Sequence, residues 1–176
     1  MSAWERIDKA SVDHNPWYRV SRDRYRLPNG EVGTYTYVDI PGSTMVIPIL
    51  DDGRAVLVRQ FRYLMQRPSL EFPCGGLKEG YTPLFNAQEE LREEAGLVAS
   101  DWRKLGEFAP YNGVSNEYCH VFRARGLAGV EAAPEETESI EIVHLTLDEI
   151  RSEIRRGELW DGMTIACLSI FDIGGD

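Results

Sequence analysis

The chain has 176 residues, 43% of them hydrophobic and 27% charged, which is typical of one soluble globular domain. The formal net charge of −10 at pH 7 argues against nucleic acid as a partner, because an acidic surface repels phosphate backbones. No apolar run approaches the about 20 residues that a membrane-spanning helix needs, so we expect no membrane association.

The three cysteines, at positions 74, 119 and 167, lie far apart in the chain and form no Cys-x-x-Cys pair. This odd, scattered set predicts neither a disulfide framework nor a zinc site. The first residues also lack the apolar core of a signal peptide. We therefore expect reduced thiols in a cytoplasmic protein.

The N-terminal part of the chain predicts antiparallel strands. Residues 17–40 form a predicted hairpin, and Leu27-Pro28-Asn29-Gly30 is its turn. Two further β-rich runs follow at 44–50 and 54–60. Asp51-Asp52-Gly53 joins these runs and is a second hairpin signal.

The rest of the chain mixes strands and helices. A short strand is expected at 69–72, followed by a helix at 83–95 that begins with a proline and ends before Gly96, as helices commonly do. The remaining expected elements are strands at 103–109, 117–124 and 139–146 and helices at 147–156 and 163–171. Because strands and helices do not alternate regularly, we expect an α+β fold or an α/β/α sandwich and not a Rossmann order.

The helix at 83–95 carries three glutamates beside its apolar stripe. At about 100° per residue, one core-facing stripe holds Leu84, Ala87, Leu91 and Ala95. Glu90 and Glu94 stack next to this stripe, and Glu93 lies further round the helix. The three carboxylates are therefore predicted to project from one edge.

Two interpretations of this acidic edge are open. A solvated face, with Lys78 and Arg92 as loose partners, is the usual explanation for a run of charge. A divalent cation, Mg²⁺ in particular, would instead offset the repulsion among the carboxylates. The glycine-rich segment at 73–80 favours the second interpretation, because glycines let backbone groups approach a ligand closely.

The segment from Gly75 to Leu97 resembles the signature of the Nudix hydrolase family, G-x5-E-x7-R-E-U-x-E-E-x-G-U, where U is aliphatic. Gly75 matches the first glycine, and residues 90–97 match the final E-U-x-E-E-x-G-U portion without a gap. Tyr81 replaces the motif's first glutamate and Glu89 replaces its arginine. In the family these two positions look like a structural pair, so their joint change fits the loss of a salt bridge better than the loss of catalysis.

The flanks of this motif are similar to ADP-ribose pyrophosphatases, at residues 60–63, 69–75, 110–117 and 140–142. In that subfamily an N-terminal hairpin often helps to build a dimer. The resemblance thus implies a Nudix-type α/β/α sandwich with a mixed sheet at 43–176. It also implies an N-terminal β-hairpin extension at 1–42 and a homodimer.

The resemblance also implies roles for individual residues. The expected ligands of Mg²⁺, or of Mn²⁺ as an alternative, are Glu90, Glu93, Glu94 and the backbone carbonyl of Cys74. Glu93 also counts among the expected catalytic residues. The general base is expected in the acidic loop, at Glu136 or Glu138, and Glu138 is preferred because it directly precedes the predicted strand. A plain solvated loop is the alternative.

Three residues are candidate substrate contacts. Arg62 is either a charged fork for the diphosphate or part of a surface ion pair. Glu71 either contacts the nucleotide or sugar or is structural at its strand end. Tyr111 either stacks on a base or packs in the core.

The implied activity is Mg²⁺-dependent hydrolysis of the diphosphate linkage of a nucleoside diphosphate sugar, with ADP-ribose favoured, to a nucleoside monophosphate and a sugar phosphate. Alternatives are GDP-mannose or a dinucleotide as substrate, a non-catalytic nucleotide-binding module, and a purely structural domain. The glycine loop and the three retained glutamates favour an enzyme over the last two.

Overall fold

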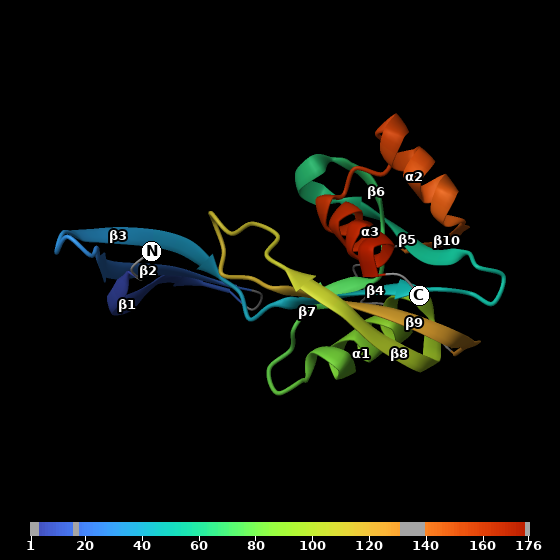
Figure 1. Ribbon diagram of the computed structural model, residues 1–176, viewed down its shortest axis with the longest axis horizontal. Coiled ribbons are helices and arrows are strands. Elements are labelled where there is room, and N and C mark those ends of the chain that lie inside the picture. The colour runs from blue at the N-terminus through green and yellow to red at the C-terminus, as the bar shows by residue number, and fades with distance from the viewer. Residues whose placement is uncertain (1–3, 16–17, 131–139, 175–176) are drawn as a thin grey trace.

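The computed structural model describes residues 4–15, 18–130 and 140–174. Figure 1 shows a body of sheets and helices, from which a long three-stranded sheet projects. We call this projecting sheet the arm. In the described part of the chain, no helix has the length and apolar character needed to cross a membrane.

The arm consists of β1 (Glu5–His14), β2 (Arg19–Arg26) and β3 (Val32–Asp39), paired antiparallel in that order. The β2–β3 pairing confirms the predicted hairpin. Its turn closes with the Gly30 N–H donating to the Leu27 carbonyl at 2.9 Å, and Gly30 has a φ of +89° that suits glycine. β1 was not predicted, because all of its residues are exposed and no alternation of apolar residues marks it.

The arm is attached to the body through the loop at 110–117. The Val38 N–H donates to the Val114 carbonyl at 2.8 Å. Asn116 makes the second contact, since its Oδ1 accepts from the Ile40 N–H at 2.9 Å and its Nδ2 donates to Asp39 Oδ1 at 2.6 Å. These bonds set where the arm stands relative to the body.

A four-stranded mixed sheet forms the centre of the body (Figure 1). Its strands, in spatial order, are β7 (Cys74–Gly76), β4 (Ser43–Pro48), β9 (Cys119–Gly129) and β8 (Leu97–Phe108). β4 pairs parallel to β9, while the other two pairings are antiparallel. The mixed sheet was therefore predicted correctly, although β8 and β9 are longer than expected.

A second, antiparallel sheet holds β10 (Glu141–Leu145), β5 (Ala55–Arg62) and β6 (Arg67–Glu71), with a 3-10 turn, η1 (Tyr63–Met65), between the last two. The expected pairing of β4 with β5 was wrong. The turn at 51–53 forms, but only Ile49 and Ala55 make a bridge before the strands separate. The reason is that both edges of β4 are already occupied by β7 and β9.

Helices cover both sides of the sheets, as Figure 1 shows. α1 (Pro83–Ala95) lies on one side, and α2 (Leu147–Arg156) and α3 (Gly162–Gly174) lie on the other. β4 faces both layers: Met45 packs in the cluster that includes α2 and α3, whereas Val46 packs in the cluster that includes α1. The α/β/α arrangement is thus confirmed.

Candidate active site

α1 is fixed in place by its ends and by one buried amide. The Thr82 hydroxyl accepts from the Phe85 N–H at 3.2 Å, and Gly96 ends the helix with a φ of +62°. Asn86 is fully buried; its Nδ2 donates to Thr44 Oγ1 at 2.9 Å and its Oδ1 accepts from the Lys78 N–H at 3.0 Å. The amide therefore joins α1 to β4 and to the glycine-rich loop.

One predicted core position on α1 was wrong. Ala87 and Leu91 are fully buried as expected, but Leu84 is 39% exposed. Phe85 is also exposed, so the first turn of α1 lies outside the core and contact with the sheet begins at Asn86. The glutamates one to two turns later are consequently held against the sheet.

Glu90, Glu93 and Glu94, which we call the glutamate cluster, meet the glycine-rich loop at β7. Glu90 and Glu94 are each only 7% exposed. Glu94 Oε2 accepts from the Cys74 N–H at 3.0 Å. A Cβ added to Gly75 would lie 2.2–2.4 Å from the Glu90 carboxyl atoms, so any larger residue here would displace that carboxyl. The glycine and the helix of the sequence motif are therefore in direct contact.

Two cations contact the third glutamate. Lys78 Nζ lies 3.0 Å from Glu93 Oε2 and 3.7 Å from Glu90 Oε1, and Arg92 Nη2 lies 3.1 Å from Glu93 Oε1. Within the residues that the structure describes, no three His, Cys, Asp or Glu side chains stand close enough together to hold an ion as they are. Glu93 pairs instead with Lys78 and Arg92.

A cavity of about 830 Å³, the site cavity, brings these groups together with part of the arm. Its walls include all three residues of the glutamate cluster, the loop at 74–79 and Arg62. Further lining residues come from the arm and its junction, namely Asn15, Tyr18, Arg19 and Asp39. Its volume is in the usual range for a small-molecule site. No local pattern in the sequence marks these arm residues, which reach the cavity through the long-range docking of β3.

Arg62 and Glu71 form a two-pronged ion pair. Arg62 Nε donates to Glu71 Oε1 at 2.8 Å, and its Nη2 bonds the second carboxylate oxygen. Glu71 is only 3% exposed, whereas Arg62 lines the site cavity. The hydrogen bond that Arg62 donates to Glu71 raises the pKa of Arg62 further above its ordinary value. The predicted ion pair is thus present, and it holds the guanidinium at the cavity wall.

Other predicted site residues are placed elsewhere. Tyr111 is 67% exposed and is not part of the site cavity, so the structure does not bring it to the glutamate cluster. Glu136 and Glu138 lie outside the described residues. A hydrogen bond with Cys119 and burial raise the pKa of the Cys74 thiol, so this thiol stays protonated and is a poor metal ligand. The group of Cys74 that suits a metal ion is therefore its backbone carbonyl.

The two positions that depart from the motif have local partners of their own. Tyr81 packs edge-on against Phe85, with ring centroids 4.6 Å apart. Glu89 accepts from Arg92 Nη2 at 2.8 Å, and this hydrogen bond lowers the pKa of Glu89. The expected loss of a salt bridge between the two positions therefore leaves neither residue unsupported.

Comparison with known proteins gives a family match, two relatives and one solved structure. Residues 40–164 match the NUDIX domain family. The ADP-ribose pyrophosphatase of Bacillus subtilis (strain 168) is 34% identical over 140 residues, covering 78% of this chain and 76% of that protein. The methanol dehydrogenase activator of Bacillus methanolicus is 31% identical over 153 residues, covering 86% and 83%. A crystal structure of an ADP compounds hydrolase superposes with a TM-score of 0.84 at 18% identity, over 97% of this chain and 92% of that one, which shows a shared fold.

Proposed function

Because this chain belongs to the NUDIX family, we propose that it hydrolyses the diphosphate linkage of a nucleoside diphosphate sugar, with ADP-ribose as the preferred substrate. Water adds to one phosphorus, the bridging P–O bond breaks, and a nucleoside monophosphate and a sugar phosphate leave. The observation that carries the proposal is the site cavity, which is lined both by the glutamate cluster and by polar and aromatic residues of the arm. The glutamate cluster suits a metal-bound diphosphate, and the arm residues suit a nucleoside.

Nudix hydrolases generally act with a divalent metal ion, and the donors here fit one. Glu90, Glu93, Glu94 and the Cys74 carbonyl offer only oxygen, which Mg²⁺ prefers and Mn²⁺ accepts. Two of these carboxylates are buried, and Gly75 leaves the space that Glu90 fills. The ion would neutralise charge on the diphosphate and make water a better nucleophile.

The side chains around the cluster have separate tasks in this proposal. Arg62, oriented by Glu71, donates hydrogen bonds to the diphosphate. Tyr18 and Arg19, on the arm side of the cavity, contact the nucleoside. Proton removal from the attacking water is assigned to Glu138 or Glu136, a role that stays a prediction.

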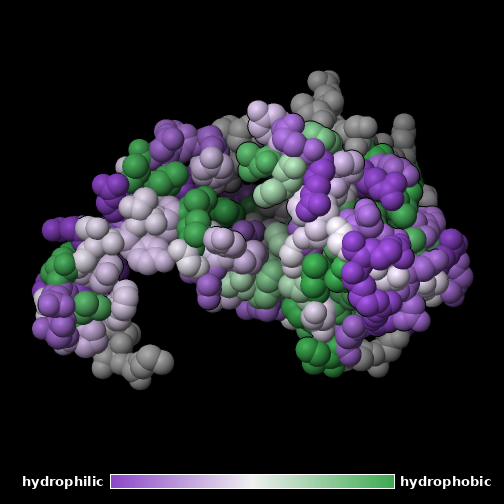
Figure 2. Space-filling view, turned by 90° about the horizontal axis from the view of Figure 1, so that it is seen from above, coloured by the Kyte–Doolittle hydropathy of each residue, from purple (hydrophilic) through white to green (hydrophobic). Residues whose placement is uncertain are grey.

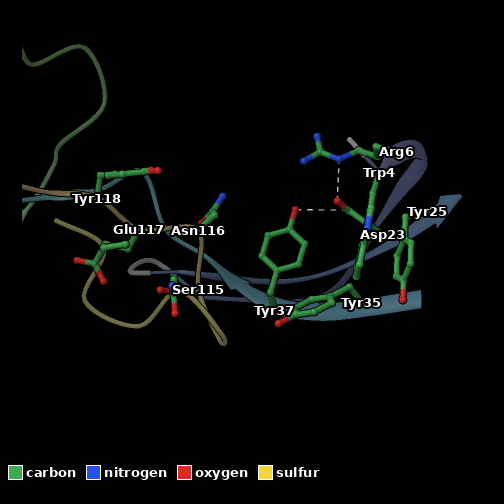
Figure 3. Close-up of a pocket in the computed structure, with 12 residues that line it drawn as sticks. Trp4, Arg6, Asp23, Tyr25, Tyr35, Tyr37, Ser115, Asn116, Glu117 and Tyr118 are labelled. Atoms are coloured by element: carbon green, nitrogen blue, oxygen red, sulfur yellow. Dashed lines mark hydrogen bonds and ion pairs between the residues drawn. The ribbon is translucent and has the colours of Figure 1, made fainter. Parts of the chain in front are cut away.

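We further propose that residues 1–42 form a dimerisation element and that 43–176 form the hydrolase domain. A second hollow of about 580 Å³, the aromatic hollow, lies between the arm and the 109–118 segment. Figure 3 shows arm tyrosines facing Ser115 to Tyr118 across it, and Figure 2 shows the arm standing apart from the body. Trp4, Tyr35 and Tyr118 are 43–58% exposed, and a second copy of the chain would cover such aromatic surface.

A substrate panel tests the proposed activity. Purified protein is incubated with ADP-ribose, GDP-mannose and a dinucleotide, with Mg²⁺ or with a chelator, and phosphate-containing products are separated by chromatography. We expect AMP and ribose phosphate from ADP-ribose, and only with the metal. Turnover of no member would refute the enzyme. Sedimentation as a monomer would refute the proposed dimer.

We also propose a cytoplasmic location, which the three free thiols support.

A further inference from the structure

Lys78 is a cation inside the glutamate cluster that the proposed hydrolysis leaves without a role. Its Nζ lies 3.0 Å from Glu93 Oε2 and 3.7 Å from Glu90 Oε1, and the residue lines the site cavity. Its backbone is anchored, because its N–H donates to the fully buried Asn86 at 3.0 Å. α1 therefore carries the glutamates and also anchors the backbone of Lys78, whose side chain bridges Glu90 and Glu93.

We propose that the Lys78 ammonium is the internal counter-cation of the glutamate cluster, and that a divalent metal ion displaces it on binding. The proposal rests on the assignment of the cluster as the metal site. Its physical basis is the burial of Glu90 and Glu94, each 7% exposed, on adjacent turns of one helix. Buried like charges are costly unless a cation lies beside them, and Lys78 supplies one before the metal does.

Displacement follows from the shared partners. The ammonium and a metal ion held by Glu90 and Glu93 repel each other and compete for the same carboxylate oxygens. The Lys78 side chain is 44% exposed, so its pairing with Glu93 is of the weak, partly solvated kind that a divalent ion replaces easily. A salt link to Arg92 at 3.1 Å, on the other side of Glu93, can remain.

Once displaced, the ammonium stays in the site cavity, because the Lys78 backbone does not move away from Asn86. A diphosphate in that cavity is then its natural partner. Metal binding thus makes a phosphate-binding cation available, and substrate in turn favours the metal-bound state, since coupling between two sites is reciprocal. A lysine with a purely structural role would not link the two affinities in this way.

The test is Lys78→Met, which keeps the side-chain length and removes the charge. Mn²⁺ binding to the substrate-free protein is measured by electron paramagnetic resonance or calorimetry. We expect Lys78→Met to bind Mn²⁺ about 2- to 5-fold more tightly than the wild type, the factor that a partly exposed ion pair provides. At saturating metal, its KM for the nucleotide sugar should rise several-fold, so the two affinities change in opposite directions.

Lys104→Met is the matched control. Lys104 pairs with Glu107 at 2.8 Å, its side chain is 48% exposed, and it is not part of the site cavity. This variant should bind Mn²⁺ as the wild type does. Lys78→Gln repeats the test should methionine prevent folding.

The outcomes separate the two proposals. Unchanged or weaker Mn²⁺ binding in folded Lys78→Met and Lys78→Gln would refute the counter-cation and leave the metal site intact. An unchanged KM in Lys78→Met at saturating metal would refute the proposed contact between the Lys78 ammonium and the diphosphate. Absence of Mn²⁺ binding in the wild type and both variants would instead overturn the metal site, and with it the counter-cation.

Discussion

Replacing Gly75 with alanine places a methyl group against the Glu90 carboxyl. The added Cβ would lie 2.2 Å from the Glu90 Cδ and 2.3–2.4 Å from its two oxygens. Ordinary contacts between such atoms begin at about 3.4 Å, so the carboxyl must move by about 1 Å. Glu90 is only 7% exposed, and its carboxyl lies against Gly75 of β7, which leaves little room for that shift.

The size of the expected effect follows from this displacement. Metal–oxygen distances in proteins tolerate about 0.2 Å, so a 1 Å shift removes Glu90 from any ligand set. We expect turnover of ADP-ribose in Mg²⁺ to fall by about 100-fold, or about 2.7 kcal/mol in transition-state stabilisation. The crowding should also cost about 1–3 kcal/mol in the free energy of unfolding.

Gly76→Ala is a control at the neighbouring residue, because a Cβ there meets nothing within 4 Å. Turnover is followed by AMP release, and folding is followed by urea denaturation with circular dichroism. Gly76→Ala should retain nearly full activity and stability. If Gly75→Ala turned over substrate at the wild-type rate, or if both variants lost activity equally, the contact between Gly75 and Glu90 would not hold the site together.

Three further perturbations test other parts of the site. Glu94→Gln keeps the side-chain shape but not the charge, so turnover should fall about 100-fold while the unfolding temperature changes little; normal activity would remove Glu94 from the metal ligands. Arg62→Met leaves the buried Glu71 carboxylate unpaired and should lower the free energy of unfolding by about 1–3 kcal/mol. Arg62→Met should also raise the KM for the substrate. Adding Glu71→Gln to Arg62→Met should regain the lost stability but leave the KM raised. Recovery of both stability and KM would show that Arg62 has no part in binding. A hydrogen bond from Lys9 lowers the pKa of Asp39 below its ordinary 3.8. The stability from Asp39 is therefore complete above pH 3.8 and is lost as the pH falls through the lower folded-state pKa, so hydrogen exchange of the arm should accelerate in that range, but not in Asp39→Asn.

Elements with strong local signals were predictable from the sequence. The bounds of α1 and α2 match the expected 83–95 and 147–156, because a proline and a capping glycine mark α1 and periodic apolar residues mark α2. The motif also marked the glycine-rich segment and the three glutamates as parts of one site. In these cases residues close in the sequence determine where the helix begins and ends, and tertiary contacts do not change those bounds.

Features set by distant parts of the chain were not predictable in this way. β1 has no exposed-to-buried alternation, since none of its residues is buried, and it is held by pairing with β2 and by the ion pair of Lys9 with Asp39 of β3. The arm residues at the site cavity depend on the docking of β3 against the 110–117 loop. The sequence indicated Lys78 as a loose partner of the acidic face, but which glutamates it contacts depends on how the glycine-rich loop folds over α1.

The parallel pairing of β4 with β9 has a consequence for the order of folding. It joins Ser43 to Cys119, which are far apart along the chain, so a long segment must be closed before the pair forms. β7, which carries Gly75, pairs on the other edge of β4. The candidate site is therefore built on a sheet that contains a non-local pairing, and a chain that ended before β9 would carry the acidic helix without one strand of that sheet.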